Sequence, residues 1–267
     1  MSFQDTAPGI IPGAVLSCPG SCHLGLIVRY DGTDYHGFQR QAGQPTVQAM
    51  IEQRCQEIFG PGRLLGASRT DAGVHAEGQV VVWQGPVPLP MDRVAFVLNH
   101  KLPRDIQVVR AFRVREGWDP RRQPSYKQYS YRIWRGSEAP PLALYRFAWW
   151  NVEELSWRRL HEASNLFLGA HDFRAFRTEG SSAETTVRTI VISRWASEQN
   201  GRIWRYQVMG TGFLYRMVRH MVAAMIEAAK PGGTLAVIQQ GLADPRGKVG
   251  ALTPARGLTL DHIQFRD

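Results

Sequence analysis

Cysteine is scarce in this 267-residue sequence, which contains three. A small, odd number of cysteines does not provide the disulfide framework of a small secreted domain, so we expect a protein of the reducing cytoplasm. Cys18, Cys22 and His23 lie close together, but no second Cys/His pair with ligand spacing accompanies them. The sequence therefore predicts no metal site.

Long apolar runs and targeting signals are also missing. No run of about eighteen apolar residues occurs, so we expect no membrane-spanning helix. Residues 1–23 lack a basic start, and proline and glycine interrupt their apolar positions. We interpret them as a flexible N-terminal extension and not as a secretion signal.

Acidic residues are outnumbered: 23 Asp and Glu stand against 32 Lys and Arg, which gives a formal net charge of +9. This excess favours a polyanionic partner such as nucleic acid, through long-range attraction and counterion release. Solubility charge on an ordinary basic enzyme is the alternative. Neither a phosphate-cradling glycine loop nor a dinucleotide fingerprint is present, so any chemistry is expected to run without a cofactor.

Apolar periodicity indicates two halves that each mix strands with helices. The simplest arrangement is an α+β fold of two similar subdomains, residues 24–115 and 116–267, divided in the polar stretch 116–125. We expect their antiparallel sheets to lie edge to edge, with a cleft at the junction. Strands are expected at residues 24–31, 78–84, 106–113, 129–135, 186–198, 201–210 and 258–265, and helices at 47–58 after a Thr46 cap, 92–98, 152–169 after an Asn151 cap, 213–230 and 234–243.

Asp71 is the first candidate for chemistry, in the stretch GASRTDAGVHAEGQVVVW. A neighbouring cation such as Arg69 favours the ionised form of a carboxylate. Ala72 and Gly73 let another backbone or a flat ligand come close. Asp71 could equally hold its own turn through side-chain to backbone hydrogen bonds. A lone aspartate can also be a covalent nucleophile.

Aromatic and basic side chains alternate in KQYSYRIW, where Lys127, Tyr129 and Tyr131 share one face of an expected strand. Such interleaving suits stacking on an unpaired base. The competing interpretation places the rings in the core, which we expect for one of the two.

The segment FLYRMVRHMVAAM carries Arg216, Arg219 and His220 at helical spacing on one face. Arg219 lies at the edge of the apolar stripe, where an unpaired arginine would be costly to bury. We therefore expect it to have an anionic partner, and a carboxylate from the first half would serve. Arg216 could instead lie on a solvated face.

These motifs resemble those of the tRNA pseudouridine synthase A family. GASRTDAGVH is similar to its signature G-x-G-R-T-D-A-G-V-H. The likeness covers residues 24–265 in the same order and continues in YDGTDYHGFQRQ, KQYSY, HDFRAF, FLYRMVRHMV and PARGLTL.

The resemblance implies a pseudouridine synthase fold with helices on one side of an extended sheet and a central RNA-binding cleft. It implies a cofactor-free homodimer that isomerises uridines 38 to 40 of the tRNA anticodon arm. Asp71 is implied as the essential aspartate, Tyr129 as the ring that stacks on the target base, Arg219 as the basic partner of the aspartate and Arg69 as the arginine that displaces the base. From the same blocks we expect RNA contacts from Arg40, Gln41, Lys127 and Arg216.

Three positions depart from the family pattern: Ser68 replaces a usual glycine, Phe38 a frequent tryptophan and Ala175 a common serine. None removes a reacting group, although Ser68 could alter how closely RNA approaches the turn. Two other functions remain open. One is a non-catalytic RNA-binding module or tRNA chaperone, and the other is a nucleobase glycosylase.

Overall fold

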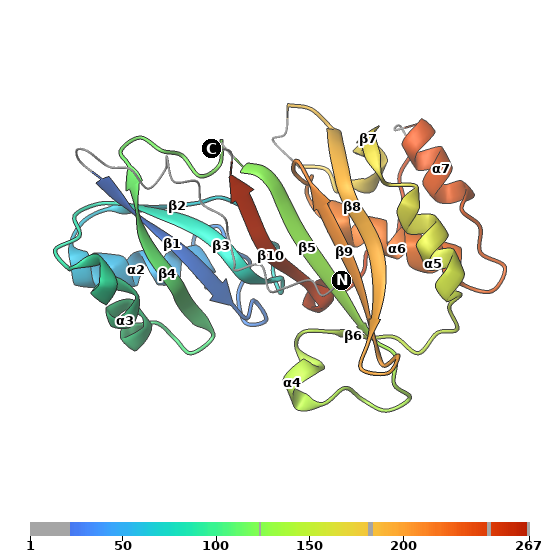
Figure 1. Cartoon of the computed structure of the whole chain (residues 1–267), viewed down its shortest axis with the longest axis horizontal. Helices are drawn as coiled ribbons and strands as arrows, with labels where there is room; N and C mark the ends of the chain where they lie inside the picture. The colour runs from blue at the N-terminus through green and yellow to red at the C-terminus, as the bar shows by residue number, and fades with distance from the viewer. Residues whose placement is uncertain (1–21, 123, 181–183, 245–246, 266–267) are drawn as a thin grey trace, which may run out of the picture. The chain divides into compact units, whose positions relative to one another are not determined.

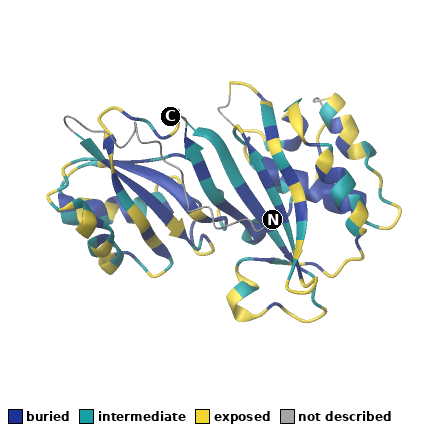
Figure 2. Ribbon diagram, in the orientation of Figure 1, coloured by how far each residue is buried: buried dark blue, intermediate teal, exposed yellow. Residues whose placement is uncertain are grey.

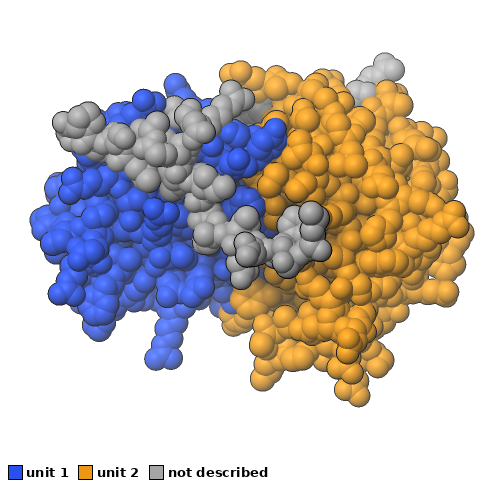
Figure 3. Space-filling model, in the orientation of Figure 1, with its two compact units in different colours: residues 1–126, 260–267 blue, residues 127–259 orange. Residues whose placement is uncertain are grey.

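The computed structural model describes residues 22–122, 124–180, 184–244 and 247–265. The proposed extension at residues 1–23 lies outside this part, except that Cys22 and His23 already belong to the first strand. The chain divides into two compact units (Figure 3), unit 1 with Met1–Tyr126 and Leu260–Asp267 and unit 2 with Lys127–Thr259. The division therefore falls after the expected residue 115, and the C-terminal strand belongs mainly with the first half.

Unit 1 is an antiparallel sheet covered by two helices (Figure 1). The strand order is β4-β1-β3-β10, and β2 pairs with β3. In the register, Ile27 lies opposite Val80 on one side and Arg110 on the other. The elements are β1 (Cys22–Tyr30), α2 (Val47–Phe59), β2 (Arg63–Gly66), β3 (His75–Gln84), α3 (Met91–Lys101), β4 (Ile106–Arg115) and β10 (Leu258–Phe265).

Local sequence explains the firmest parts of unit 1. The Thr46 side chain accepts a hydrogen bond from the Ala49 amide and so caps α2, as expected from the sequence. The valines at positions 80 to 82 are fully buried in β3 and lie beside the equally buried interior of β1 (Figure 2). Burial on both faces gives these strands continuous apolar runs instead of alternation.

Unit 2 repeats the combination of sheet and helices. Its strands run in the order β5-β9-β8-β7, the pairings among them are antiparallel, and β6 pairs with β5 in parallel. The elements are β5 (Pro124–Trp134), α4 (Leu142–Tyr145), β6 (Trp149–Trp150), α5 (Trp157–Asn165), β7 (Gly169–Asp172), β8 (Val187–Glu198), β9 (Ile203–Gly210), α6 (Met217–Ala229) and α7 (Ala236–Ala243), with short 3-10 helices at Arg174–Phe176 and Ala255–Gly257. The α+β class expected from the sequence is confirmed.

Two helices begin later than the sequence indicates. Helix α5 starts at Trp157 because Ser156 caps it, while Asn151, the expected cap, accepts a hydrogen bond from Arg135 instead. Helix α6 starts at Met217 because Arg216 adopts a left-handed backbone with φ of 61°, which a helix cannot include. Arg216 therefore does not share a helical face with Arg219.

The C-terminal strand matches its expected limits, residues 258–265, but not its expected subdomain. β10 pairs with β3 of unit 1, where a side chain at Gly78 would come within 2.6 Å of the Asp261 carbonyl oxygen. A glycine in a strand interior allows such a close backbone approach. In the described ranges, no helix is both long and apolar enough to cross a membrane.

Candidate active site

Asp71 lies on the loop that joins β2 to β3 in unit 1. The Val74 amide donates to the Asp71 carbonyl oxygen at 3.1 Å, which closes a turn over Ala72 and Gly73. Gly73 has φ of 76°, a conformation that glycine adopts without strain. The turn is thus closed by a main-chain hydrogen bond. Asp71 is half-buried, while the neighbouring Arg69 is exposed.

Buried side chains hold this loop from below. The Gln79 amide nitrogen donates to the Ser68 carbonyl at 2.7 Å, and the Ser68 amide donates to the Gln79 side-chain oxygen at 3.2 Å. One residue before Asp71, the Thr70 hydroxyl lies 2.8 Å from the Tyr30 hydroxyl. Ser68, Thr70, Gln79 and Tyr30 are all buried, so the backbone that carries Asp71 is fixed on both sides.

The loop after β1 packs directly against the Asp71 turn. The Gly32 amide donates to His75 Nδ1 at 3.1 Å, and the Phe38 amide donates to the Thr70 carbonyl at 3.0 Å. A side chain at Gly32 would come within 2.0 Å of the Val74 carbonyl oxygen, and one at Gly37 within 2.7 Å of the Thr70 carbonyl oxygen. Two glycines are thus required where two backbones touch.

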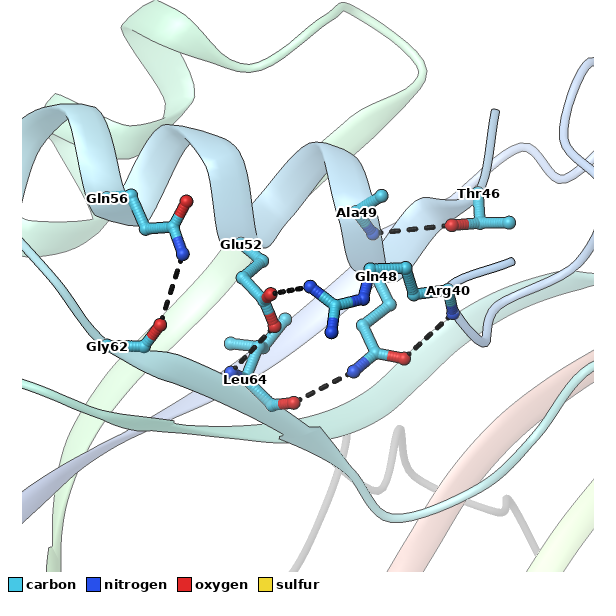
Figure 4. Close-up of polar contacts among 8 residues, drawn as sticks. All are labelled: Arg40, Thr46, Gln48, Ala49, Glu52, Gln56, Gly62 and Leu64. Atoms are coloured by element: carbon cyan, nitrogen blue, oxygen red, sulfur yellow. Dashed lines mark hydrogen bonds and ion pairs between the residues drawn. The ribbon is translucent and has the colours of Figure 1, made fainter. Parts of the chain in front are cut away.

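Arg40 and Gln41 lie on this same loop, and Figure 4 shows the polar contacts of Arg40. Arg40 Nη1 pairs with Glu52 Oε1 at 2.8 Å, and the other oxygen of Glu52 accepts the Leu64 amide at 3.0 Å. The Gln41 amide nitrogen donates to the His36 carbonyl at 2.9 Å. Both residues are exposed, so each secures the loop and also faces solvent.

In unit 2, Tyr129 and Tyr131 take different positions on β5. Tyr131 is fully buried, and its hydroxyl donates to the Pro254 carbonyl at 2.8 Å, which makes it a core residue. Tyr129 is 6% exposed and meets Phe213 edge to face, with ring centroids 5.1 Å apart. Both rings are therefore buried, whereas the sequence led us to expect only one of them in the core.

Lys127 precedes Tyr129 on β5 and lies opposite Gly210 in the register. Burial, together with the positive charge of Arg188, lowers the pKa of Lys127 to about 8. Burial also lowers the pKa of the Arg188 guanidinium, whose Nη1 donates to the Thr185 carbonyl at 2.8 Å. Two cations that are costly to desolvate therefore lie near one end of β5 and β8.

Arg219 is half-buried in the first turn of α6. Its Nε donates to the Thr253 carbonyl at 2.7 Å, and the Thr253 hydroxyl donates back to the Arg219 carbonyl at 3.2 Å. Because Tyr131 binds the next carbonyl, that of Pro254, the segment before β10 connects β5 to α6. Arg216 lies just before α6, with its guanidinium 4.8 Å from the centre of the Tyr215 ring.

The sequence-predicted residues thus fall into two groups. Unit 1 holds Asp71, Arg69, Arg40 and Gln41 on two loops in contact. Unit 2 holds Tyr129 and Lys127 on β5, and Arg219 and Arg216 at the start of α6. Sequence reasoning missed the supporting residues Gln79, His75, Thr253 and Arg188. Only Gln79 had a usable signal, since it is a polar residue directly before three valines in a buried strand.

Comparison with known proteins agrees with these observations. Residues 26–121 and 163–266 match the family described as tRNA pseudouridine synthase. The chain is 38% identical to tRNA pseudouridine synthase A of Acetivibrio thermocellus, over 90% of this chain and 98% of that protein. It is 33% identical to the protein of the same name from Clostridium kluyveri, over 91% and 99%. Against that of Myxococcus xanthus the identity is 36%, over 91% and 92%.

The match extends over most of each chain, which places the protein among the pseudouridine synthases, a class of isomerases. Within that class, the chain belongs to the tRNA pseudouridine synthase family. The family resemblance expected from the sequence motifs is confirmed, and a non-catalytic binding module is not favoured.

Proposed function

We propose that the protein converts uridine to pseudouridine at positions 38 to 40 of the tRNA anticodon arm, with Asp71 as the nucleophile. The observation that carries this proposal is the Asp71 turn. An aspartate of the family signature is half-buried on a loop whose backbone is fixed by Gln79, Thr70 and the opposing glycine loop. Such support holds the carboxylate in a fixed orientation, as nucleophilic catalysis requires.

The reaction breaks the bond between C1′ of the ribose and N1 of uracil, and joins C1′ to C5 of the same base. N1 gains a proton and C5 releases one, so atoms balance and no oxidant is consumed. The Asp71 carboxylate acts either by adding to C6 of the ring or by assisting departure at C1′. A target within a stem must first be turned out of the stack, which costs a few kcal/mol.

We propose that residues of the second group bind the flipped base and balance the negative charge of Asp71. Tyr129 stacks on the uracil, which recovers about 1–3 kcal/mol. Arg219 pairs with Asp71 and favours its ionised form. Arg69 takes the place of the displaced base, and Arg40, Gln41, Lys127 and Arg216 contact the RNA backbone.

The test uses tRNA transcripts that carry tritium at C5 of uridine, because pseudouridine formation releases that hydrogen to water. The wild-type protein should release tritium, and Asp71→Asn should release none while it still binds tRNA. Asp92→Asn, in the exposed first turn of α3, is the matched control and should keep the wild-type rate. Tritium release at the wild-type rate from Asp71→Asn would refute the assignment.

The alternatives leave different products. A glycosylase would produce free uracil with its C5 tritium retained, and an RNA chaperone would leave the RNA unchanged. Transcripts with a single uridine at position 38, 39 or 40 identify the site that is modified. The proposal also includes a homodimer in the cytoplasm. A molar mass by light scattering that corresponds to a monomer would contradict the dimer.

A further inference from the structure

Unit 1 contains an open pocket of about 430 Å³ at the far end of the strands that carry the Asp71 loop. Its lining includes Arg63, Leu65, Gln84, Asp119, Arg121 and Arg122. Arg63 begins β2 and pairs with Gln84, the last residue of β3. The pocket therefore lies about 30 Å along β3 from His75, which follows the Asp71 turn. We propose that this pocket binds a phosphodiester of the tRNA backbone remote from the isomerised uridine, an inference that rests on the proposed function.

The loop that supplies two of the arginines is firmly held. Trp118 is 1% exposed and packs on Phe265 with ring centroids 5.0 Å apart. Its amide donates to the Arg115 carbonyl at 3.2 Å, after Gly117 with φ of 79°. The buried tryptophan fixes the start of the loop, so the arginines that follow are positioned before a ligand arrives, which lowers the entropic cost of binding.

Asp119 organises the arginines of this loop. It accepts hydrogen bonds from the amide, Nε and Nη2 of Arg121, and its Oδ2 lies 3.7 Å from Arg122 Nε. The hydrogen bonds from Arg121 lower the pKa of Asp119 and keep it ionised. With Arg63 included, the pocket has three guanidinium groups and one carboxylate, so two positive charges remain for a ligand.

The composition of the pocket selects the ligand. Small apolar ligands favour enclosed apolar cavities, whereas this pocket is open and lined mainly by polar and charged side chains. Guanidinium groups match the oxygens of a phosphate with paired hydrogen bonds. In an open site water competes with a single free phosphate. A polynucleotide gains additional binding free energy because each neutralised phosphate releases counterions. A backbone phosphodiester is therefore favoured over a free anion.

The experiment compares two double variants of the full-length protein. Arg63→Gln with Arg122→Gln removes both spare charges and keeps the Arg121–Asp119 pair. Arg93→Gln with Arg158→Gln removes two exposed charges from helices α3 and α5 and is the matched control. The dissociation constant for uridine-containing tRNA is measured between about 50 and 200 mM salt, the range over which phosphate contacts weaken strongly.

The pocket variant should reduce the slope of log Kd against log salt by about 1, since the loss of one phosphate contact removes about 0.7 to 0.9. The control variant should keep the wild-type slope, and equal slopes for the two variants would overturn the proposal. A pocket that bound only free phosphate would not contact tRNA, so it would also give equal slopes for the two variants.

Failure here is distinct from failure of the proposed isomerase. The slopes are measured by binding alone and need no turnover. If the wild type releases tritium and the two variants have equal slopes, only the pocket assignment falls. If the wild type releases none, the isomerase assignment falls whatever the slopes are.

Discussion

The side chain of Gln79 makes two hydrogen bonds to the backbone of Ser68, of 2.7 and 3.2 Å, and Gln79 is fully buried. This pair ties the middle of β3 to the loop that leads to Asp71. Ser68 replaces the usual glycine of the signature, and its contact with Gln79 is made through its backbone amide and carbonyl.

We predict that Gln79→Leu destabilises the protein and slows catalysis. The substitution leaves the buried Ser68 amide and carbonyl without partners, at a cost of about 2–4 kcal/mol in the free energy of unfolding. Displacement of the Asp71 loop should lower kcat by about 10–100-fold with little change in KM for tRNA. Urea unfolding and tritium release measure the two effects. Gln53→Leu, on the exposed face of α2, is the control, and equal effects from both variants would contradict the role of Gln79.

The contact between the two loops of unit 1 gives a second prediction. Gly32→Ala places a methyl group 2.0 Å from the Val74 carbonyl oxygen, so one backbone must move. We expect a loss of about 1–3 kcal/mol in stability and a loss of activity larger than that predicted for Gln79→Leu. Gly250→Ala, where nothing lies within 4 Å, should leave both unchanged. Wild-type turnover by Gly32→Ala would show that the close approach is not needed for catalysis.

Patterns that depend on neighbours in the sequence predicted local structure well. Thr46 caps α2 as expected, and the strand at residues 258–265 has its expected limits. The turn between β8 and β9 also follows from local sequence. It contains Asn200 and Gly201, residue types that tolerate the positive φ that both adopt. In each case a few adjacent residues determine the result.

Features that depend on distant residues were not predictable from the sequence. The start of α6 depends on a left-handed Arg216, and the cap of α5 depends on Asn151 being used by Arg135. β2 has four residues and makes sense only as the partner of β3. Asp71, the proposed nucleophile, was singled out through its motif. The residues that hold it in place were not, because hydrogen bonds such as that from Gln79 to Ser68 follow from tertiary packing.

Lys127 provides a prediction with a defined pH window. Burial and the charge of Arg188 lower its pKa in the folded protein to about 8. In the unfolded chain the pKa of a lysine is about 10.4. Between these values the unfolded state binds more protons, so stability contributed by this group rises with pH. Lys127→Met should therefore stabilise the protein at pH 7, by an amount on the order of 1–3 kcal/mol, and this gain should disappear as the pH approaches about 10.

The measurement is urea unfolding of the wild type and the variant from neutral pH upward. Lys101→Met, at an exposed lysine of α3, controls for the loss of one lysine charge. A Lys127→Met variant that is no more stable than the wild type at pH 7, or whose gain persists at high pH, would refute the cost assigned to burying Lys127.

His220 on α6 gives a further pH-dependent prediction, at acid pH. Its Nδ1 lies 2.8 Å from the Ala251 carbonyl and must carry the proton, so Nε2 accepts from the Thr178 hydroxyl at 3.0 Å. Burial, with smaller effects from Arg219 and Arg216, lowers the pKa of this imidazole below its ordinary value. The folded protein therefore holds a neutral ring, and the unfolded chain takes up the proton first as the pH falls.

Stability from this group is present above the unfolded pKa of about 6.5 and is lost as the pH falls below it. We expect His220→Phe to be less stable than the wild type at pH 7, because it loses both hydrogen bonds. It should lose less stability than the wild type between about pH 6.5 and 5. His100→Gln, at an exposed histidine of α3, should follow the wild-type curve. Since the ring lies next to Arg219, parallel curves for the wild type and His220→Phe would mean that a charged imidazole is tolerated there, and the neutral assignment would be wrong.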